Sequence, residues 1–460
     1  MEQQERIESD SMGKVSLPSW AYWGAQTQRA VENFTVSDAR MPRSMMRALA
    51  LIKKYAARTN SYLGVLDQKL ADAIDKAATE VLDGKWKDHF PIDVFQTGSG
   101  TSWNMNMNEV ISNRANEILG QPLGTKKPIH PNDHVNRGQS SNDVIPAAIH
   151  VANRMEAERL ISSLELLHKS LDAKAQEFKS VVKIGRTHLQ DAVPMTLGQE
   201  FSGYVTQIEK SIKRVRNVLP NLEELALGGT AVGTGINCDP EFAPLVCKGI
   251  SEETALPFRP AANKFEAIAT RDAQVELMGA LNTIATSFMK IANDLRILAS
   301  GPRSGLGEIT LPSLQPGSSI MPGKVNPVIP EMVIQVAAHI TGKLVSVTIG
   351  GQNAPLELNM MNPLIAYETL SSMELLGKTA VALADKCVSG IIANEERCTY
   401  WIEWSVALVT PLATEIGYDR AAALAHRAFK ENRTVRDIAR EEKVLPDEKL
   451  EQLLDPRNMI

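Results

Sequence analysis

The chain has 460 residues, of which 43% are hydrophobic and 22% charged, with a formal net charge of −5. This composition is typical of a soluble globular protein of two or three domains, and the lack of a basic tract argues against binding to nucleic acids or anionic membranes. The segment Met1–Lys14 has neither the apolar core of a signal peptide nor the Arg-rich bias of a transit peptide. No apolar run approaches the roughly 20 residues of a membrane span. The four scattered cysteines form no CxxC pair, so we expect a cytoplasmic protein with reduced thiols.

The first polar break in the chain is Thr97-Gly98-Ser99-Gly100-Thr101, followed by three asparagines at 104, 106 and 108. Small hydroxyl side chains and free backbone N–H groups suit an anion. The alternative is a Gly-rich turn in which Thr101 is an ordinary N-cap of the next helix.

The second break contains His130-Pro131-Asn132-Asp133 and then Ser140-Ser141-Asn142-Asp143. The second tetrad precedes a long helical pattern, so it predicts an N-cap, and its neutral donors at a helix N-terminus also suit a carboxylate. The spacing of His130, Asp133 and His134 matches no metal-ligand pattern, so we expect no metal site.

Long helices dominate the rest of the chain. Apolar residues recur at steps of three and four over 160–178, 197–219 and 275–298, and Pro363 suits the first turn of a further helix ending near Lys386. Helices of roughly 25–38 residues would be about 40–57 Å long. We predict that their broad apolar stripes are buried between subunits as well as within one, the alternative being a self-contained five-helix bundle.

The segment Gly185–Asp191 interrupts this pattern and contains His188 between Thr187 and Leu189. A histidine beside Thr and Arg just before a helix is a candidate acid or base, and a purely structural histidine is the alternative.

The last break is Gly317–Pro327, with the sequence GSSIMPGKVNP. Five residues separate its glycines and Val325 follows Lys324, so it does not match the nucleotide-binding P-loop. A mobile loop with two serines, a lysine and an asparagine could close over an anionic substrate, whereas the alternative is a flexible connector.

These breaks indicate an all-α, three-domain subunit. We expect a mostly helical N-terminal domain (1–139), a central bundle of long helices (140–392) and a small helical C-terminal domain (393–460).

The 317–327 loop resembles the signature sequence of the fumarase/aspartase superfamily. Within it, the chain is similar to class II fumarases almost end to end, including 22–33, 185–204, 227–237 and 301–308. Thr97–Thr101, Ser141 and His188 favour fumarases over aspartases. The chain departs from the family pattern at Trp103, His134 and Arg137. These departures bear mainly on the assignment of a second binding site.

The resemblance implies reversible anti addition of water to fumarate, giving (S)-malate. It implies that Ser318 is the base for the C3 proton, stabilised by Lys324 and loop N–H groups, and that His188 paired with Glu331 handles the proton at C2. The implied substrate-binding residues are Ser99, Gly100, Thr101, Ser140, Ser141, Asn142, Thr187, Ser319, Val325 and Asn326.

The family assembles as a homotetramer with a multi-helix core, in which each active site is shared by three subunits. His130, Pro131, Asn132 and Asp133 match a second dicarboxylate site, with Lys127 as its basic neighbour. No metal ion or organic cofactor is implied. The alternatives are an aspartate ammonia-lyase of the same superfamily and a helical scaffold without activity.

Overall fold

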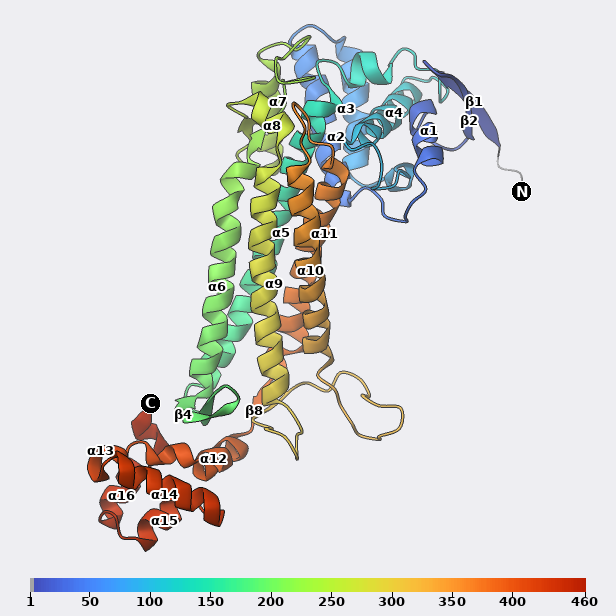
Figure 1. Cartoon of the computed structure of the whole chain (residues 1–460). Coiled ribbons are helices and arrows are strands. Elements are labelled where there is room, and N and C mark those ends of the chain that lie inside the picture. The colour runs from blue at the N-terminus through green and yellow to red at the C-terminus, as the bar shows by residue number, and fades with distance from the viewer. Residues whose placement is uncertain (1–3) are drawn as a thin grey trace. The chain divides into compact units, whose positions relative to one another are not determined.

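The computed structural model describes residues 4–460, so the first three residues of the predicted N-terminal domain lie outside it. The described chain is predominantly helical, which confirms the predicted fold class (Figure 1). Within these residues, β-structure comprises four two-stranded sheets and an isolated bridge between Arg40 and Asp93. The all-α expectation therefore misses only short hairpins and bridges.

Contacts divide the chain into two compact units. Unit 1 comprises residues 1–161, 213–282 and 339–376, and unit 2 comprises 162–212, 283–338 and 377–460. Each unit contains parts of all five long helices, which are α5 (Ser141–Glu177), α6 (Leu197–Leu222), α9 (Asp272–Leu298), α10 (Val328–Gln352) and α11 (Asn362–Lys386). The division into three domains stays a prediction.

Unit 1 adds a set of shorter helices to its parts of the long ones. Burial of the apolar faces of α2, α3 and α4 against one another forms its core, with Leu49, Ile74 and Val110 fully buried. Asp67 caps α3 by accepting hydrogen bonds from the backbone N–H groups of Lys69 and Leu70. Its own elements are β1 (Glu5–Asp10), β2 (Gly13–Pro18), α1 (Ala25–Asn33), α2 (Arg43–Tyr62), α3 (Gln68–Leu82), η1 (Lys87–His89), α4 (Thr101–Ile118), η2 (Pro131–Val135), β5 (Glu224–Leu225), α7 (Phe242–Thr254), β6 (Arg259–Pro260) and α8 (Lys264–Ala269).

The predicted long helices are confirmed, with α5 running 37 residues and α6 and α9 running 26 and 27. Their apolar stripes, however, are already buried within one chain, as Leu167, Phe201 and Phe288 illustrate. Neighbouring helices of the same chain cover these positions. The additional burial of the stripes between subunits stays a prediction.

The helix α10 exposes apolar surface, unlike the buried stripes of α5, α6 and α9. It is long and apolar enough to cross a membrane by length and composition, and most of that apolar stretch is not buried within the chain. Val345 and Ile349 are exposed on it. The expectation that no apolar run approaches membrane-span length is wrong for this segment. Glu331, His339 and Lys343 interrupt its apolar residues, but its mean hydropathy stays high.

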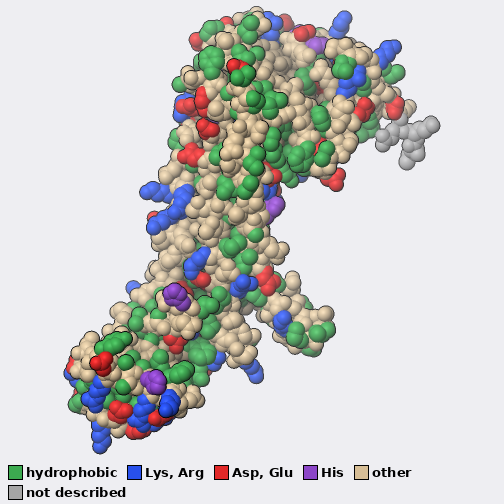
Figure 2. Space-filling view, viewed as in Figure 1, with side chains coloured by type: hydrophobic (Ala, Val, Ile, Leu, Met, Phe, Trp, Pro, Cys, Tyr) green, Lys and Arg blue, Asp and Glu red, His purple; other side chains and the backbone are tan. Residues whose placement is uncertain are grey.

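Unit 2 contains a compact C-terminal group of helices. Leu408, Leu424, Ile438 and Leu450 are buried in one apolar cluster there. On the face shown in Figure 2, Lys and Arg side chains are interspersed with Asp and Glu, in agreement with the absence of a basic tract. The elements are α12 (Glu395–Trp404), α13 (Ala413–Ile416), α14 (Tyr418–Glu431), α15 (Val435–Glu441) and α16 (Asp447–Leu453), with the short helices η3 (Val388–Gly390), η4 (Val406–Val409) and η5 (Pro456–Met459).

A β-hairpin of unit 2 is held by a buried group of charges. It pairs β3 (Val182–Thr187) with β4 (Gln190–Thr196), and β7 (Ile309–Thr310) pairs with β8 (Ile392–Ala393) nearby in the same unit. The Glu308 side chain is 0% exposed and forms ion pairs with Lys183 (3.1 Å) and Arg186 (2.8 Å), both on β3. Lys183 also contacts Glu200 at 2.6 Å. One buried carboxylate therefore neutralises two cations on the strand that leads to Thr187 and His188.

Replacing Glu308 with glutamine should lower the free energy of unfolding by about 3–5 kcal/mol, because the buried Lys183 and the mostly buried Arg186 lose their shared anion. Urea denaturation followed by circular dichroism measures this loss. The matched control is Glu200→Gln, at a partly exposed carboxylate, for which about 1 kcal/mol or less is expected. Equal, small losses in the two variants would contradict this account of the hairpin.

Candidate active site

Two glycines shape the loop 97–101 at the start of α4. Gly98 lies so close to Met360 that a Cβ atom built on it would be 1.8 Å from the Met360 carbonyl oxygen. Gly100 is the N-cap of α4 and has a φ of 77°, in the left-handed region that favours glycine. Thr101 is therefore the first residue of the helix and not its N-cap, so that alternative is wrong. Its side chain is left available for other contacts.

Three hydroxyl groups from this loop and from α5 form a chain. Hydrogen bonds of 2.8 Å link Ser99 Oγ to Thr101 Oγ1 and Thr101 Oγ1 to Ser141 Oγ. Two bonds use only two of the three hydroxyl hydrogens, so one hydrogen remains to be donated to a ligand. The structure thus brings together predicted site residues that are 40 positions apart in the sequence.

Ser140 and Asn142 complete this cluster at the N-terminus of α5. Ser140 Oγ accepts a hydrogen bond from the Asn142 backbone N–H (3.1 Å), as expected of the predicted N-cap. The Asn142 side-chain amide donates to the Ala231 carbonyl (2.9 Å), which leaves its second N–H for another acceptor. Neutral donors at the positive end of a long helix suit a carboxylate.

The predicted second site forms a separate turn in unit 1. His130 Nδ1 accepts from the backbone N–H groups of Asn132 and Asp133 at 3.2 and 3.3 Å. Burial lowers the pKa of His130, although the carboxylate of Asp133 opposes the shift. With Nδ1 as the acceptor, the neutral ring carries its hydrogen on Nε2 and can donate it to an anion. Pro131 is buried beneath the exposed Asn132 and Asp133.

The unusual residues His134 and Trp103 have structural roles. His134 Nδ1 accepts a hydrogen bond from the His130 backbone N–H (2.8 Å), so it steadies this turn. Trp103 is fully buried on α4.

In unit 2, His188 occupies the tip of the β3–β4 hairpin, not the approach to a helix that the sequence suggested. The two turn residues, His188 and Leu189, have φ values of 55° and 60°. Two-residue hairpin turns of this kind need positive φ at both positions, which normally selects Asn or Gly. A histidine and a leucine in such strained positions are characteristic of functional sites. Thr187, His188 and Leu189 are all exposed at the tip.

The loop 317–327 folds back on itself. The Gly317 backbone N–H donates to the Lys324 carbonyl (2.8 Å), and the Asn326 amide donates to the Gly317 carbonyl (2.7 Å). Inside this closure, Ser318 Oγ accepts hydrogen bonds from the backbone N–H groups of Ile320 (3.3 Å) and Met321 (3.0 Å). These two donors would stabilise negative charge on the Ser318 oxygen.

The remaining predicted residues of unit 2 do not converge within one chain. Ser319, Lys324 and Val325 are exposed on the loop, and Glu331 is exposed in the first turn of α10. Across residues 4–460 no hydrogen bond or ion pair joins His188 to Glu331. The predicted His188–Glu331 pair therefore stays a prediction.

The buried groups behind the unit 1 cluster were not predicted from the sequence. Asp143 is fully buried one residue after Asn142, and Lys53 is fully buried on α2. The Lys53 ammonium donates to Asn136 Oδ1 (2.9 Å) and Gln139 Oε1 (3.0 Å). Only the position of Asp143, directly after Ser140-Ser141-Asn142, gave a signal in the sequence. Lys53 lies within a helical pattern and gave none.

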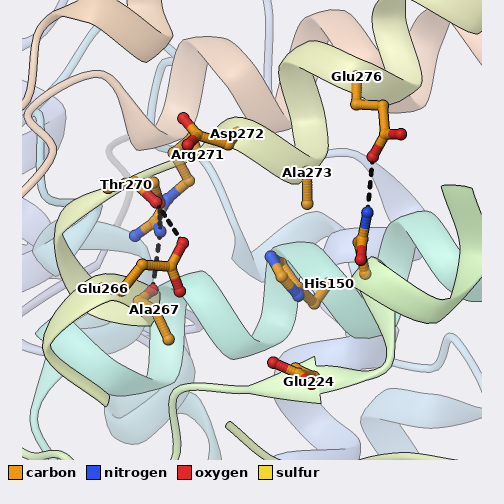
Figure 3. Close-up of a pocket in the computed structure, with 10 residues that line it drawn as sticks. His150, Glu224, Glu266, Ala267, Thr270, Arg271, Asp272, Ala273 and Glu276 are labelled. Carbon is orange, nitrogen blue, oxygen red and sulfur yellow. Dashed lines mark hydrogen bonds between the residues drawn. The ribbon is translucent and has the colours of Figure 1, made fainter. Parts of the chain in front are cut away.

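A cavity of about 360 Å³ lies elsewhere in unit 1, beside the start of α9 (Figure 3). Burial lowers the pKa of His150 to about 4 and that of Arg271 to about 9. The Arg271 guanidinium is fixed by Asn362 Oδ1 (2.6 Å) and by backbone carbonyls. None of the predicted site residues lines this cavity, which is bordered by His150, Asn221, Glu224, Glu266, Ala267, Thr270, Arg271, Asp272, Ala273 and Glu276.

Among residues 4–460, no group of three or more His, Cys, Asp and Glu side chains could hold a metal ion.

Comparisons with known proteins identify the family of the chain. A lyase family model matches residues 13–342, and a fumarase C C-terminus model matches residues 408–460. The chain is 53% identical to the mitochondrial fumarate hydratase of Danio rerio over 99% of this chain and 90% of that protein. It is 51% identical to the class II fumarate hydratase of Methylorubrum extorquens over 99% of this chain and 97% of that protein.

Solved structures give the same result. The class II fumarase of Schistosoma mansoni matches with a TM-score of 0.95 and 43% identity over 99% of both chains. A fumarate lyase:delta crystallin from Brucella melitensis, solved with bound cobalt, matches with a TM-score of 0.95 and 46% identity over 99% of both chains. The chain therefore belongs to the class II fumarase family of lyases.

Proposed function

We propose that this chain is a fumarate hydratase, which adds water reversibly to fumarate in anti fashion to give (S)-malate. The observation that carries this proposal most directly is the environment of Ser318, whose Oγ receives two backbone N–H groups. A serine is a weak base unless its alkoxide is stabilised, and these donors supply that stabilisation.

The difficult step in the dehydration direction is removal of the C3 proton of malate. The resulting carbanion is stabilised by the adjacent carboxylate, which then carries two negative charges. Ser318 takes this proton, and Lys324 adds positive charge beside it. The groups that bind the substrate are neutral apart from Lys324, so they solvate the two carboxylates without neutralising them completely.

His188 acts at the other carbon of the substrate. Its ring protonates the hydroxyl group that leaves C2 as water, and it accepts a proton from water in the hydration direction. Glu331 of the assembled enzyme orients the ring and favours its charged form. The exposed hairpin tip makes this imidazole available to a partner subunit.

The active enzyme is a homotetramer in which three subunits share each site. The exposed apolar side chains of α10, including Val345 and Ile349, support this assembly, since burial of such a helix against copies of itself removes apolar area from water. The exposed positions of His188, Lys324 and Glu331 on each chain are also those expected of groups that are completed by neighbours.

Two further roles follow from the same proposal. His130, Pro131, Asn132 and Asp133 bind a second dicarboxylate away from the reaction, with Lys127 beside them. The Nε2–H group of His130 donates a hydrogen bond to this second ligand.

The four free cysteines suit a reducing compartment such as the cytoplasm, which cell fractionation would test.

The reaction itself is tested by incubating the purified protein with malate and, separately, with aspartate. We expect the absorbance of the fumarate double bond to increase with malate only, and to do so equally in the presence of EDTA, because no step requires a metal ion. Turnover of aspartate but not malate would identify an ammonia-lyase, and turnover of neither would identify an inactive scaffold. Loss with EDTA and recovery with added metal would refute metal independence.

The variant Ser318→Ala tests the identity of the base. We expect turnover of malate to decrease by at least about 100-fold, because a positioned general base contributes about that much or more. The mass of the assembly, measured by light scattering, should not change. A nearly normal rate would remove Ser318 from this role.

Sharing of sites is tested by mixing two inactive variants, Ser318→Ala and His188→Asn, under conditions in which subunits exchange. Hybrid tetramers contain sites that combine an intact loop from one chain with an intact His188 from another, so we expect partial recovery of activity. The matched control mixes Ser318→Ala with Lys324→Ala, whose lesions lie in one loop, and should recover nothing. Lack of recovery in the first mixture, with exchange verified by mass, would rule out sites shared in this way.

A further inference from the structure

Lys53 is a buried cation that the proposed mechanism does not use. It lies on α2 and is 0% exposed, whereas lysine is almost never fully buried without a specific partner. Its ammonium donates hydrogen bonds to the neutral side-chain oxygens of Asn136 (2.9 Å) and Gln139 (3.0 Å). Removing a charge from water is costly, so a lysine in this place calls for an explanation beyond packing.

Both acceptors belong to the turn that leads into α5. Gln139 directly precedes Ser140, and its side-chain amide donates to two backbone carbonyls of the same turn, at 3.1 and 3.2 Å. The Asn136 amide in turn donates to the Gln139 carbonyl at 3.1 Å. The turn is therefore closed on itself, and the Lys53 ammonium binds both of the side chains that close it. The position of Ser140 depends on this closure.

The same ammonium is connected to α4. The oxygen of Asn136 that accepts from Lys53 also accepts from the side-chain amides of Asn104 and Asn108, at 3.2 Å each. Asn104 lies one turn after Thr101, which is the first residue of α4. One buried cation thus joins the two segments whose hydroxyl groups form the cluster, namely the start of α4 and the start of α5.

A buried carboxylate fixes the turn from its other side. Asp143 accepts hydrogen bonds from the backbone N–H groups of Ser140 (2.9 Å), Gly228 (3.1 Å) and Thr230 (3.0 Å). Burial raises the pKa of Asp143 to about 6 and lowers that of Lys53 to about 7, and the charge of each opposes the shift of the other. Each group therefore helps to keep the other ionised, and Ser140 lies between their attachments.

We propose that Lys53 is a positioning residue for the reaction, which holds Asn136 and Gln139 together and thereby places residues 140–142 against the first turn of α4. This inference rests on the proposed function, since it assigns Lys53 to the support of the same dicarboxylate site. Lys53 need not touch the substrate, because a misplacement of about 1 Å caused by a distant substitution can lower a rate by about 100-fold.

The test compares Lys53→Met with Lys54→Met. Methionine retains the apolar length of lysine but cannot donate a hydrogen bond. Lys54 is the matched control, since it is also buried on α2 but pairs with Glu253 (2.7 Å) and not with the turn. The assembled enzyme is assayed for kcat and KM with malate, and for binding of succinate, an unreactive dicarboxylate, by titration calorimetry.

We expect Lys53→Met to raise KM and weaken succinate binding by about 10- to 100-fold, with a smaller change in kcat, because the cluster binds the carboxylate before and during the reaction. Lys54→Met should stay within about twofold in each quantity, although both variants lose a buried contact and should melt at a lower temperature. Unchanged KM and succinate affinity in Lys53→Met, or an equal loss in Lys54→Met, would overturn the inference.

The variant Gln139→Met tests the route of the effect and serves alone if Lys53→Met does not assemble. It removes the acceptor beside Ser140 and leaves Lys53 bound to Asn136, so succinate binding should weaken by at least about threefold. The double variant should bind succinate about as weakly as Lys53→Met alone, because the two side chains act through one contact. Unchanged affinity in Gln139→Met, or fully additive losses, would overturn the inference.

Failure of the proposed function would look different. A wild-type protein that turns over malate while Lys53→Met behaves normally would overturn only the role of Lys53. A wild-type protein that neither turns over malate nor binds succinate would overturn both, because the site that Lys53 is proposed to support would not exist.

Discussion

A small dicarboxylate is strongly hydrated, and a protein that removes it from water must replace that hydration with hydrogen-bond donors at fixed positions. In this chain the proposed donors are mostly neutral hydroxyl, amide and backbone N–H groups. Ser99, Thr101 and Ser141 form one connected chain of hydroxyls at the end of α5. Neutral donors allow charge to develop further in the transition state, since they do not neutralise the ground-state carboxylates first.

Rigid placement of these donors depends on buried charges behind them. In unit 1, Asp143 joins the start of α5 to the loop 228–231, and Lys53 binds the side chains of Asn136 and Gln139. In unit 2, Glu308 neutralises Lys183 and Arg186 on the strand that leads to His188. Each of these charges is costly to bury. Asp143 and Lys53 are hydrogen-bonded and Glu308 is ion-paired with two cations, so the local arrangement has few alternatives.

Much of the fold could be predicted because its signals are local. Apolar spacing over 160–178, 197–219 and 275–298 fixed one face of each long helix, and the structure places α5, α6 and α9 there. Charged and polar interruptions such as Glu331 and Lys343 concealed the apolar character of α10. The β3–β4 hairpin was missed because its turn uses His188 and Leu189 in place of the usual Asn and Gly.

The candidate site could be predicted in part for the same reason. Ser140-Ser141-Asn142 and the 317–327 loop stand out as polar breaks between helices, whereas Lys53 and Glu308 lie in apolar or ordinary surroundings. Their roles depend on contacts between segments far apart in the sequence, such as those from Asp143 to Gly228 and Thr230.

In the proposed enzyme, the hydroxyl cluster of one chain meets the Ser318 loop and the His188 hairpin of other chains around a single dianion. The decisive experiment is a crystal structure of the assembled protein with bound malate. We expect one ligand carboxylate within about 3 Å of Thr101 Oγ1 or Ser141 Oγ, with Ser318 Oγ and a His188 ring nitrogen from neighbouring chains at hydrogen-bond distance from the same molecule. Malate bound elsewhere, or Ser318 and His188 too far apart to reach one ligand in the assembly, would contradict it.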